Sequence, residues 1–350
     1  MAKRSYSRKG NKIQPAVMTM SFQLPSAPFQ TATTSWLDVS QIASLVNRRF
    51  YRQGLNWAVG GFKFLSTGFK GQITISKLPN TWIMSNSWEK SFRTWTKMNN
   101  EALSETQSIK PKFLDFKIYA DANHHQQGFV NNLLPYNVDP FWTGINTAVP
   151  GEWEPSKVSI PLVSPAGVFV PGETRERELI AVGASYPGNS VVTGFDALSL
   201  IEGYAASRGL PNIADPNAPL DALDTAGGTP ENWMGAIFNE GSDQSSQVLE
   251  DMITENNIAP YPFENDGTNV DTMYPNGANQ LPGLQIHSTE FISSTTVGGT
   301  TRIKGGNFPC GLIGITQYQE GEGGPFPLTF EIDLVPGNHR GYLCEPMTEM

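Results

Sequence analysis

The residues of this chain that are best suited to bind a ligand are basic residues gathered at its start. Five lie within the first twelve positions, with no acidic residue among them: Lys3, Arg4, Arg8, Lys9 and Lys12. Ammonium and guanidinium groups bind phosphate oxygens and release the counterions of a nucleic acid. The segment therefore predicts contact with a nucleic acid. Two other interpretations stay open, namely a nuclear localisation signal made of two basic pairs and a tail that only aids solubility.

A second basic group combines cations with aromatic rings. Its members are Arg48, Arg49 and Arg52, next to Phe50, Tyr51 and Trp57. Cations that follow a phosphate backbone, together with rings on which bases stack, are typical of a site for single-stranded nucleic acid. The alternative is that the rings belong to the core and that the arginines pair with acids elsewhere in the chain.

Residues that would hold a metal or carry out hydrolysis are sparse. His124 and His125 are adjacent, but no Cys or Glu partner lies nearby at the spacing of a zinc site, so we expect loop or interface histidines. We expect no metal and no other cofactor. The sequence contains no motif of a nucleotide-binding loop, a serine hydrolase or a metalloprotease, and we predict that the protein is not an enzyme.

Two groups of closely spaced acids resemble a glycosidase pair only superficially. They are Glu152 with Glu154, and Glu173 with Glu176 and Glu178. Glycoside hydrolysis needs two carboxylates on opposite sides of a cleft, which nearness in the sequence does not show. We interpret these acids as a solvated surface.

Charge is separated along the chain. Residues 1–120 contain 17 Lys and Arg and 5 Asp and Glu, whereas residues 121–350 contain 7 and 28. Between Arg208 and Arg302 there are 13 acids and no Lys or Arg. Such a chain is expected to face a polyanion with one surface and solvent or another partner with a different one. A calcium site among these acids stays open.

The elements that must position these residues are predicted to be mostly strands. Charged residues make up only 16% of the chain, and 34 Gly and 26 Pro favour turns over long helices. Apolar residues alternate cleanly in two segments, which predicts half-buried strands at 112–120 and 327–335. Further strands are expected at 16–24, 55–59, 71–78, 157–163, 178–184, 284–293 and 310–318.

Three helices are expected between these strands. The longest runs from Asn86 to Leu103, with Ser85 or Asn86 as its N-cap. Its apolar stripe would be Trp88, Phe92 and Trp95, and its basic outer face would be Lys90, Arg93 and Lys97. Two shorter helices are expected at Phe195–Arg208 and Gln244–Asn256.

We therefore predict an all-β fold, a single jelly-roll β-sandwich with a few short helices and long inserted loops. Residues 1–12 are predicted to be a disordered basic arm, because so polar a segment buries too little surface to offset its ordering entropy. Residues 13–350 would form one domain with an acidic insertion at about 209–283. We expect no membrane span and no signal peptide, and Cys310 and Cys344 either pair or remain free thiols.

Four segments carry a resemblance to a known family. They are KRSYSRKGNK (3–12), RRFYRQGLNW (48–57), LPNTWIMSNSWEKSFRTW (78–95) and FEIDLVPGNHRGYLCEPM (330–347). In these segments the chain resembles the capsid proteins of small circular single-stranded DNA viruses, in particular the smacovirus-like and related faecal-associated groups.

The resemblance implies a jelly-roll subunit that assembles with copies of itself into an icosahedral shell around single-stranded DNA. The chain would then be found in the virion and, during assembly, in the host nucleus. The family's basic arm would correspond to residues 3–12. Arg48, Arg49 and Arg52, with the bases of the longest helix, would share the inner surface. The residues themselves do not distinguish DNA from RNA.

Two other functions compete with this one. A jelly-roll carbohydrate-binding or adhesin module would bind its ligand through exposed rings such as Trp142, Trp153 and Trp233, and would not need the basic arm. A jelly-roll hydrolase would need a cleft with convergent carboxylates, one of them with a raised pKa.

Overall fold

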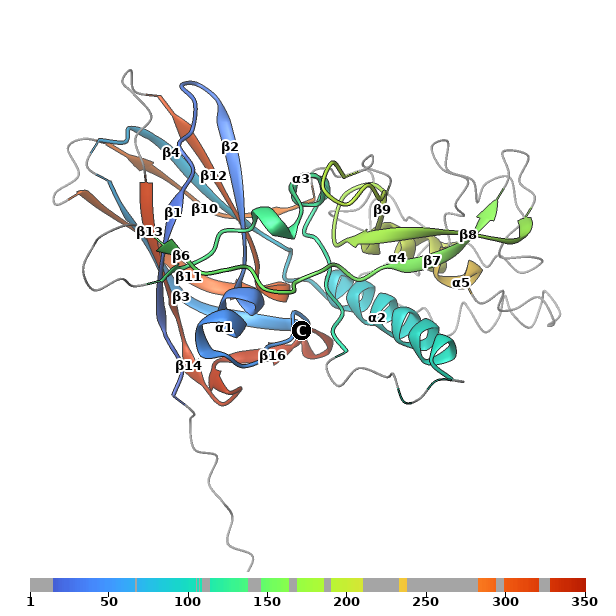
Figure 1. Cartoon of the computed structure of the whole chain (residues 1–350). Helices are drawn as coiled ribbons and strands as arrows, with labels where there is room; N and C mark the ends of the chain where they lie inside the picture. Colours follow the sequence, from blue (N-terminus) through green and yellow to red (C-terminus); the bar gives the residue numbers. More distant parts are fainter. Residues whose placement is uncertain are drawn as a thin grey trace, which may run out of the picture.

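The computed structural model describes residues 15–66, 68–104, 106, 108, 114–137, 146–163, 169–185, 190–209, 233–237, 283–293, 299–320 and 328–350. The predicted arm (1–12), the predicted helix Gln244–Asn256 and nearly all of the predicted acidic insertion (209–283) lie outside the described residues. The described residues form a β-sandwich and a second group of helices and strands beside it (Figure 1).

The sandwich consists of two antiparallel sheets. The first sheet, sheet A, contains in spatial order β1 (Thr19–Leu24), β13 (Leu328–Leu334), β3 (Leu55–Leu65) and β11 (Thr300–Phe308). A short strand, β16 (Cys344–Pro346), also pairs with the start of β3. The second sheet, sheet B, contains β10 (Gln285–Ile292), β4 (Gly71–Lys77), β12 (Leu312–Gln319) and β2 (Ala32–Asp38).

The pairing of these eight strands has the topology of a jelly roll. Counted along the chain, the first strand pairs with the eighth, the second with the seventh, the third with the sixth and the fourth with the fifth. All four pairs are antiparallel, as in a long hairpin that is wound into a barrel-like sandwich. The predicted all-β jelly-roll sandwich is confirmed.

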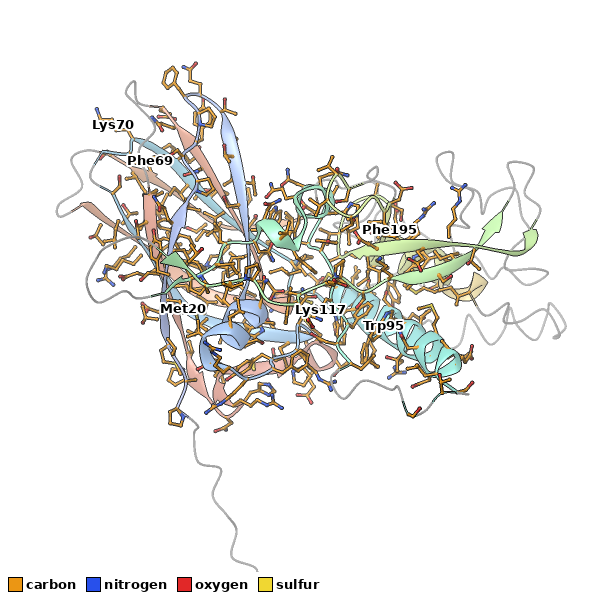
Figure 2. The ribbon with its side chains drawn as sticks, in the orientation of Figure 1. Met20, Phe69, Lys70, Trp95, Lys117 and Phe195 are labelled. Atoms are coloured by element: carbon orange, nitrogen blue, oxygen red, sulfur yellow. The ribbon has the colours of Figure 1, made fainter. Side chains whose placement is uncertain are left out.

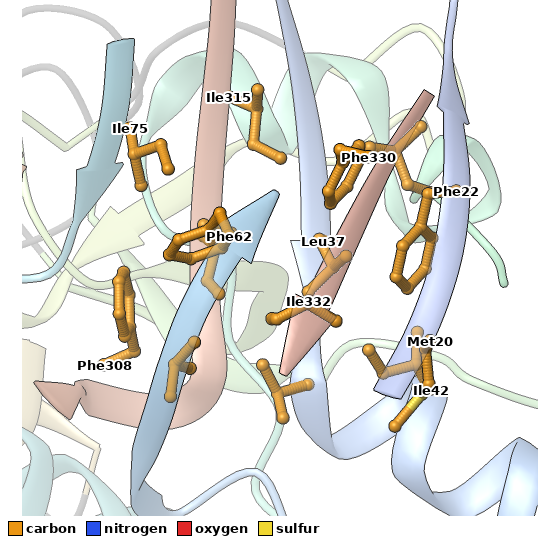
Figure 3. Close-up of a cluster of buried hydrophobic side chains, with 14 of the residues drawn as sticks. Met20, Phe22, Leu37, Ile42, Phe62, Ile75, Phe308, Ile315, Phe330 and Ile332 are labelled. Atoms are coloured by element: carbon orange, nitrogen blue, oxygen red, sulfur yellow. The ribbon is translucent and has the colours of Figure 1, made fainter. Parts of the chain in front are cut away.

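The inner faces of the two sheets meet in one apolar core (Figure 3). The alternation predicted at 327–335 is present in β13, where Leu328, Phe330, Ile332 and Leu334 are buried and the residues between them are half-buried. Phe330 stacks on Phe22 of β1 with ring centroids 4.9 Å apart. Each such side chain stabilises the fold by roughly 1.5–3 kcal/mol through its burial.

The chain leaves the sandwich after β4 and returns at β10, and we call the elements between them the insertion lobe. The departure begins at Leu78, far before the predicted start of the insertion at 209. The lobe contains α2 (Trp82–Ala102), α3 (Ala122–Gln127), a three-stranded sheet and two further helices. The sheet consists of β7 (Val158–Val163), β8 (Phe169–Ile180) and β9 (Ala197–Ser199). The two helices are α4 (Leu200–Gly209) and α5 (Trp233–Ala236).

The lobe has its own apolar core, which continues onto the end of the sandwich. Helix α2 supplies Ile83, Met84, Trp88 and Trp95 to this core, and β2 supplies Trp36. Figure 2 shows Trp95 on α2, on the lobe side of the molecule. The strand predicted at 157–163 corresponds to β7 of the lobe, whereas the one predicted at 178–184 overlaps only the end of β8, which stops at Ile180.

Helix α2 begins earlier than predicted, because Thr81 caps it. The Thr81 hydroxyl accepts a hydrogen bond from the Met84 backbone N–H over 3.4 Å. The predicted apolar stripe is correct. The predicted basic outer face is wrong for Lys90, whose Nζ donates to Ser207 Oγ over 3.1 Å and lies 5.1 Å from the centre of the Tyr204 ring on α4.

The strand predicted at 112–120 does not form within its described part, residues 114–120. Only Tyr119 makes an isolated bridge, to Ile180. The Gln53 side chain takes the place of a neighbouring strand: its Oε1 accepts from the Ile118 N–H over 2.7 Å, and its Nε2 donates to the Ile118 carbonyl over 3.1 Å. The backbone is thus satisfied without a ladder.

Candidate nucleic-acid interface

Arg48, Arg49 and Arg52 lie in the loop between α1 (Val39–Asn47) and β3. Helix α1 packs its first turns into the core and ends at Asn47, and Arg48 follows with a left-handed backbone (φ 54°, ψ 36°). Glycine is the usual residue at this position, because a Cβ is strained there. All three arginines are exposed.

Of the three rings beside these arginines, Tyr51 and Trp57 are buried and Phe50 is half-buried. Tyr51 is 1% exposed and Trp57 is fully buried, and their ring centroids lie 5.9 Å apart. The Tyr51 backbone is held by the hydroxyl of Ser44 on α1, which accepts its N–H over 2.9 Å. These two rings cannot stack against bases, so the interpretation of them as core residues is correct. No ion pair among the described residues involves Arg48 or Arg52.

A fourth arginine, which the sequence did not single out, joins this group. Arg340 lies in the hairpin between β14 (Pro336–Gly337) and β15 (Gly341–Tyr342), again with a left-handed backbone (φ 51°). Its guanidinium donates to the Phe50 carbonyl, and its own carbonyl accepts from Tyr51 Oη over 2.9 Å. Nothing in the sequence signals this contact, because almost 290 residues separate the partners. We call Arg48, Arg49, Arg52 and Arg340 the basic foot.

The start of β1 is fastened to the basic foot. Arg49 Nη1 donates to the Pro15 carbonyl over 3.2 Å, and the Val17 N–H donates to Asn47 Oδ1 over 3.0 Å. Lys12 precedes Pro15 by only three residues. The Cα atoms of the two residues therefore lie no more than about 11 Å apart. The described part of the chain thus begins beside the foot, three residues after Lys12.

The phenols beneath the foot are neutral hydrogen-bond donors. Burial raises the pKa of Tyr342 to about 12, although Arg49 acts in the opposite direction. Burial also raises the pKa of Tyr51, against the lowering effect of Arg49 and Arg340. The Tyr342 hydroxyl donates to the Val17 carbonyl over 2.6 Å. The foot therefore keeps its positive charge, because no phenolate forms beneath it near neutral pH.

Other exposed bases lie on different elements. Arg302 and Lys304 are exposed on β11, on the outer face of sheet A. Lys63 on the same face pairs with Glu331 over 2.9 Å. On α2, Arg93 pairs with Glu89, and Lys97 is exposed. The predicted sharing of one basic surface with the α2 residues therefore has no support in their contacts, which lie within the lobe.

The adjacent histidines are core residues of the lobe, so the expectation of loop or interface histidines is wrong. Both are fully buried on α3. His124 Nδ1 accepts from the Ala120 N–H over 3.1 Å and its Nε2 lies 2.9 Å from Asn132 Oδ1, while burial lowers its pKa to about 3. His125 Nε2 lies 2.9 Å from Glu178 Oε2, which also accepts from Thr193 Oγ1.

Four of the described residues that were candidates for a hydrolase or a lectin make contacts within the fold. Glu178 is fully buried against His125, whereas Glu176 is exposed and lies 3.8 Å from Lys157, so these acids do not converge in a cleft. The Trp233 ring is buried in the lobe core. Trp153 is half-buried and packs beneath Lys117. Trp142 lies outside the described residues.

Three further observations concern metal ligands, membrane spans and thiols. Among the described residues no three His, Cys, Asp or Glu side chains gather as metal ligands would. No described helix combines the length and the apolar character that a membrane crossing requires. Cys310 is buried and Cys344 half-buried, and both are free.

Comparison with known proteins adds no family. No family model, no curated protein and no solved structure matches this chain. The jelly-roll topology and the basic foot are therefore the observations from which a function has to be argued.

Proposed function

We propose that this chain is the coat protein of a small virus, which assembles with copies of itself into a closed shell and packages single-stranded DNA. The observation that carries the proposal is the basic foot, where four exposed arginines lie beside the point at which a basic arm enters the fold. Nine cations would then meet the genome from one region of the subunit. The resemblance of the sequence to single-stranded DNA virus capsids supports the same conclusion.

The fold is compatible with this function but does not select it. Jelly rolls occur in viral coats, lectins and cupin enzymes, so the argument has to come from a site. A lectin would need exposed rings, and the described candidates, Trp153 and Trp233, are packed into the structure. An array of exposed arginines instead suits a polyanion.

The backbone of the foot supports a functional reason for its arginines. Arg48 and Arg340 both have positive φ, where glycine would be less strained. Strained backbone positions of this kind cluster at functional sites. Since Tyr51 and Trp57 are buried and Phe50 is half-buried, the foot would contact mainly phosphates. Binding would then be independent of sequence and strongly dependent on salt.

The salt dependence of binding tests this function. The full-length protein, a variant that lacks residues 2–12, and a variant with Arg48, Arg52 and Arg340 changed to Ala would be titrated with a fluorescent oligothymidine at several salt concentrations. Each phosphate contact contributes about 0.7 to the slope of log K against log salt. Deletion of the arm is expected to reduce the slope by about 3.5, and the triple variant by about 2.

A matched control is Lys97→Ala, which removes an exposed cation from α2. The slope is expected to stay at the wild-type value. Unchanged slopes for both the arm deletion and the triple variant would rule out the proposed interface. Electron microscopy of the purified chain tests assembly: closed particles are expected, whereas a monomer in all buffers contradicts a coat protein.

A further inference from the structure

The edges of the two sheets differ in how well they are covered. β2 is covered by residues that follow α3: the Thr34 carbonyl accepts from Gln127 Nε2 over 3.0 Å, and the Trp36 carbonyl accepts from the Leu133 N–H over 2.7 Å. β1 is flanked by the short strand β5 (Tyr136–Asn137). These contacts block the edges of β1 and β2 against another strand.

β10, the opposite edge of sheet B, has no such cover among the described residues. Among the described strands, β10 pairs with β4 alone. A hydrogen bond links it to β11, between His287 Nε2 and the Lys304 carbonyl over 2.8 Å. The strand also presents two large apolar side chains, Ile286 (65% exposed) and Phe291 (67% exposed). An open edge with exposed apolar residues is the kind of surface that pairs with another chain.

The outer face of sheet B carries a row of threonines that ends at the β10 edge. One row of paired positions crosses all four strands and consists of threonines only: Thr34, Thr316, Thr74 and Thr289. Their hydroxyls bond in pairs, at 2.9 Å between β2 and β12 and at 3.1 Å between β4 and β10. The next row is Ala32, Tyr318, Gln72 and Phe291, so neither row contains a charge.

We propose that β10 pairs antiparallel with β10 of a second copy of this chain, across a two-fold axis at Thr289. Sheet B of one copy then continues into sheet B of the other, and the threonine row continues through Thr289 and the partner's Thr289. His287 is the extra residue of a β-bulge, because Ile286 pairs with Ser76 and Ser288 with Ile75.

This bulge brings the exposed apolar residues together. With His287 out of register, Ile286 lies opposite the partner's Phe291, and Phe291 opposite the partner's Ile286. Ser288 lies opposite the partner's Glu290, where a hydroxyl donates to a carboxylate. The strand is therefore self-complementary, as an interface around a two-fold axis requires.

Charge excludes the same pairing at the other open edge. On β11 the residues of the outer face include Arg302 and Lys304, which are both exposed. A two-fold axis at Ile303 would place Arg302 opposite the partner's Lys304, and an axis at either cation would place it opposite itself. Like charges directly opposite one another destabilise a strand pair. Charged side chains of this kind protect edges in monomers.

The inference rests on the proposed function, because a shell needs contacts between copies of the chain and the β10 pairing would be one of them. Its test uses the full-length chain and sedimentation equilibrium. Thr289→Lys and Thr289→Glu are each expected to weaken dimerisation at least about tenfold, because like charges meet at the axis. An equimolar mixture of the two variants is expected to dimerise again, which an unfolded variant would not do. Thr300→Lys, on β11, is the matched control and should dimerise as the wild type does.

A second measurement traps the contact covalently. Thr289→Cys places two thiols at positions whose Cα atoms are about 4.5–5.5 Å apart in an antiparallel pair, within the range of a disulfide. Mild oxidation is expected to give a covalent dimer, and Thr300→Cys is expected to give none. A Thr289→Lys protein that dimerises like the wild type, or a Thr289→Cys protein that forms no covalent dimer, overturns the proposal. Neither result touches the salt slope of nucleic-acid binding, so the two proposals fail separately.

Discussion

Asp38 and Trp153 join the sandwich to the insertion lobe. The Trp153 indole Nε1 donates to Asp38 Oδ2 over 3.0 Å, and Gln53 Nε2 donates to the same oxygen over 3.0 Å. The Asp38 carboxylate also caps α1, where it accepts the N–H groups of Ser40 and Gln41. Lys117 Nζ lies over the Trp153 ring, 4.7 Å from its centre. Figure 2 shows Lys117 at the junction of the two parts. One buried carboxylate therefore organises the end of β2, the start of α1 and the attachment of the lobe.

Asp38 is expected to make folding more favourable at acidic than at neutral pH. Burial raises its pKa from 3.8 to about 6, although four hydrogen bonds act in the opposite direction. A raised pKa means that its stabilising contribution is complete below pH 3.8 and is lost as the pH rises through 6. This difference between the pKa in the unfolded and folded states corresponds to about 3 kcal/mol. The free energies of unfolding of the wild type and Asp38→Asn would be measured in urea between pH 4 and pH 7.5. The difference between the two free energies should change by about this amount over that range. Parallel pH profiles would contradict the prediction.

His124 is expected to act in the opposite direction. Burial lowers its pKa from 6.5 to about 3, so its contribution is complete above pH 6.5 and is lost as the pH falls toward 3. Between pH 6.5 and pH 4 the loss amounts to about 3 kcal/mol. His124→Gln keeps a donor and an acceptor without titrating, so its stability should fall less on acidification. The same urea titration measures this, and an equal acid loss in both proteins would show that His124 does not titrate on unfolding.

Arg48→Gly is expected to separate binding from stability. Glycine relieves the left-handed backbone at this position and should leave the free energy of unfolding unchanged or raise it by up to about 1 kcal/mol. The same change removes one cation and should lower the salt slope by about 0.7. Gln30→Gly is the control, because Gln30 also has a positive φ (55°) but carries no charge. An Arg48→Gly protein with the wild-type salt slope would remove Arg48 from the interface.

Gly203→Ala is expected to loosen the lobe without unfolding the sandwich. A Cβ on Gly203 of α4 would collide with the indole of Trp233, which is 1% exposed. Overpacking of this kind costs about 1–3 kcal/mol. Thermal unfolding should show a lower first transition, and the double variant with Trp233→Leu should lose less than the sum of the single changes. Additive losses would mean that the two residues do not share this space.

Most of the strands that the sequence predicted correctly have one face in the sandwich core, although β7, also predicted, lies in the lobe and β11 of the sandwich was not predicted. β13 alternates between buried and half-buried residues, and that alternation is visible in the sequence. β2 and α1 were not predicted. At its end β2 is buried on both faces, because Leu37 lies in the sandwich core and Trp36 in the lobe core. Such a segment has no period of two.

Two features of the site and its surroundings depend on contacts that no local pattern reveals. Residues 114–120 alternate like a strand, but a single side chain, that of Gln53, satisfies the backbone of Ile118. Arg340 reaches the foot only because the hairpin of β14 and β15 lies against Tyr51. The arginines near position 50 were found from their spacing, whereas the fourth required the fold.

The position of the insertion lobe has a consequence for synthesis on the ribosome. Each of the first four sandwich strands pairs with one of the last four, and about 200 residues separate Lys77 from Gln285. At translation rates of about 5–20 residues per second, the early strands wait roughly 10–40 s for their partners. During that time Leu37, Phe62 and Ile75 have no partner sheet, and a nascent chain of this kind depends on chaperones or on its own lobe to avoid premature association.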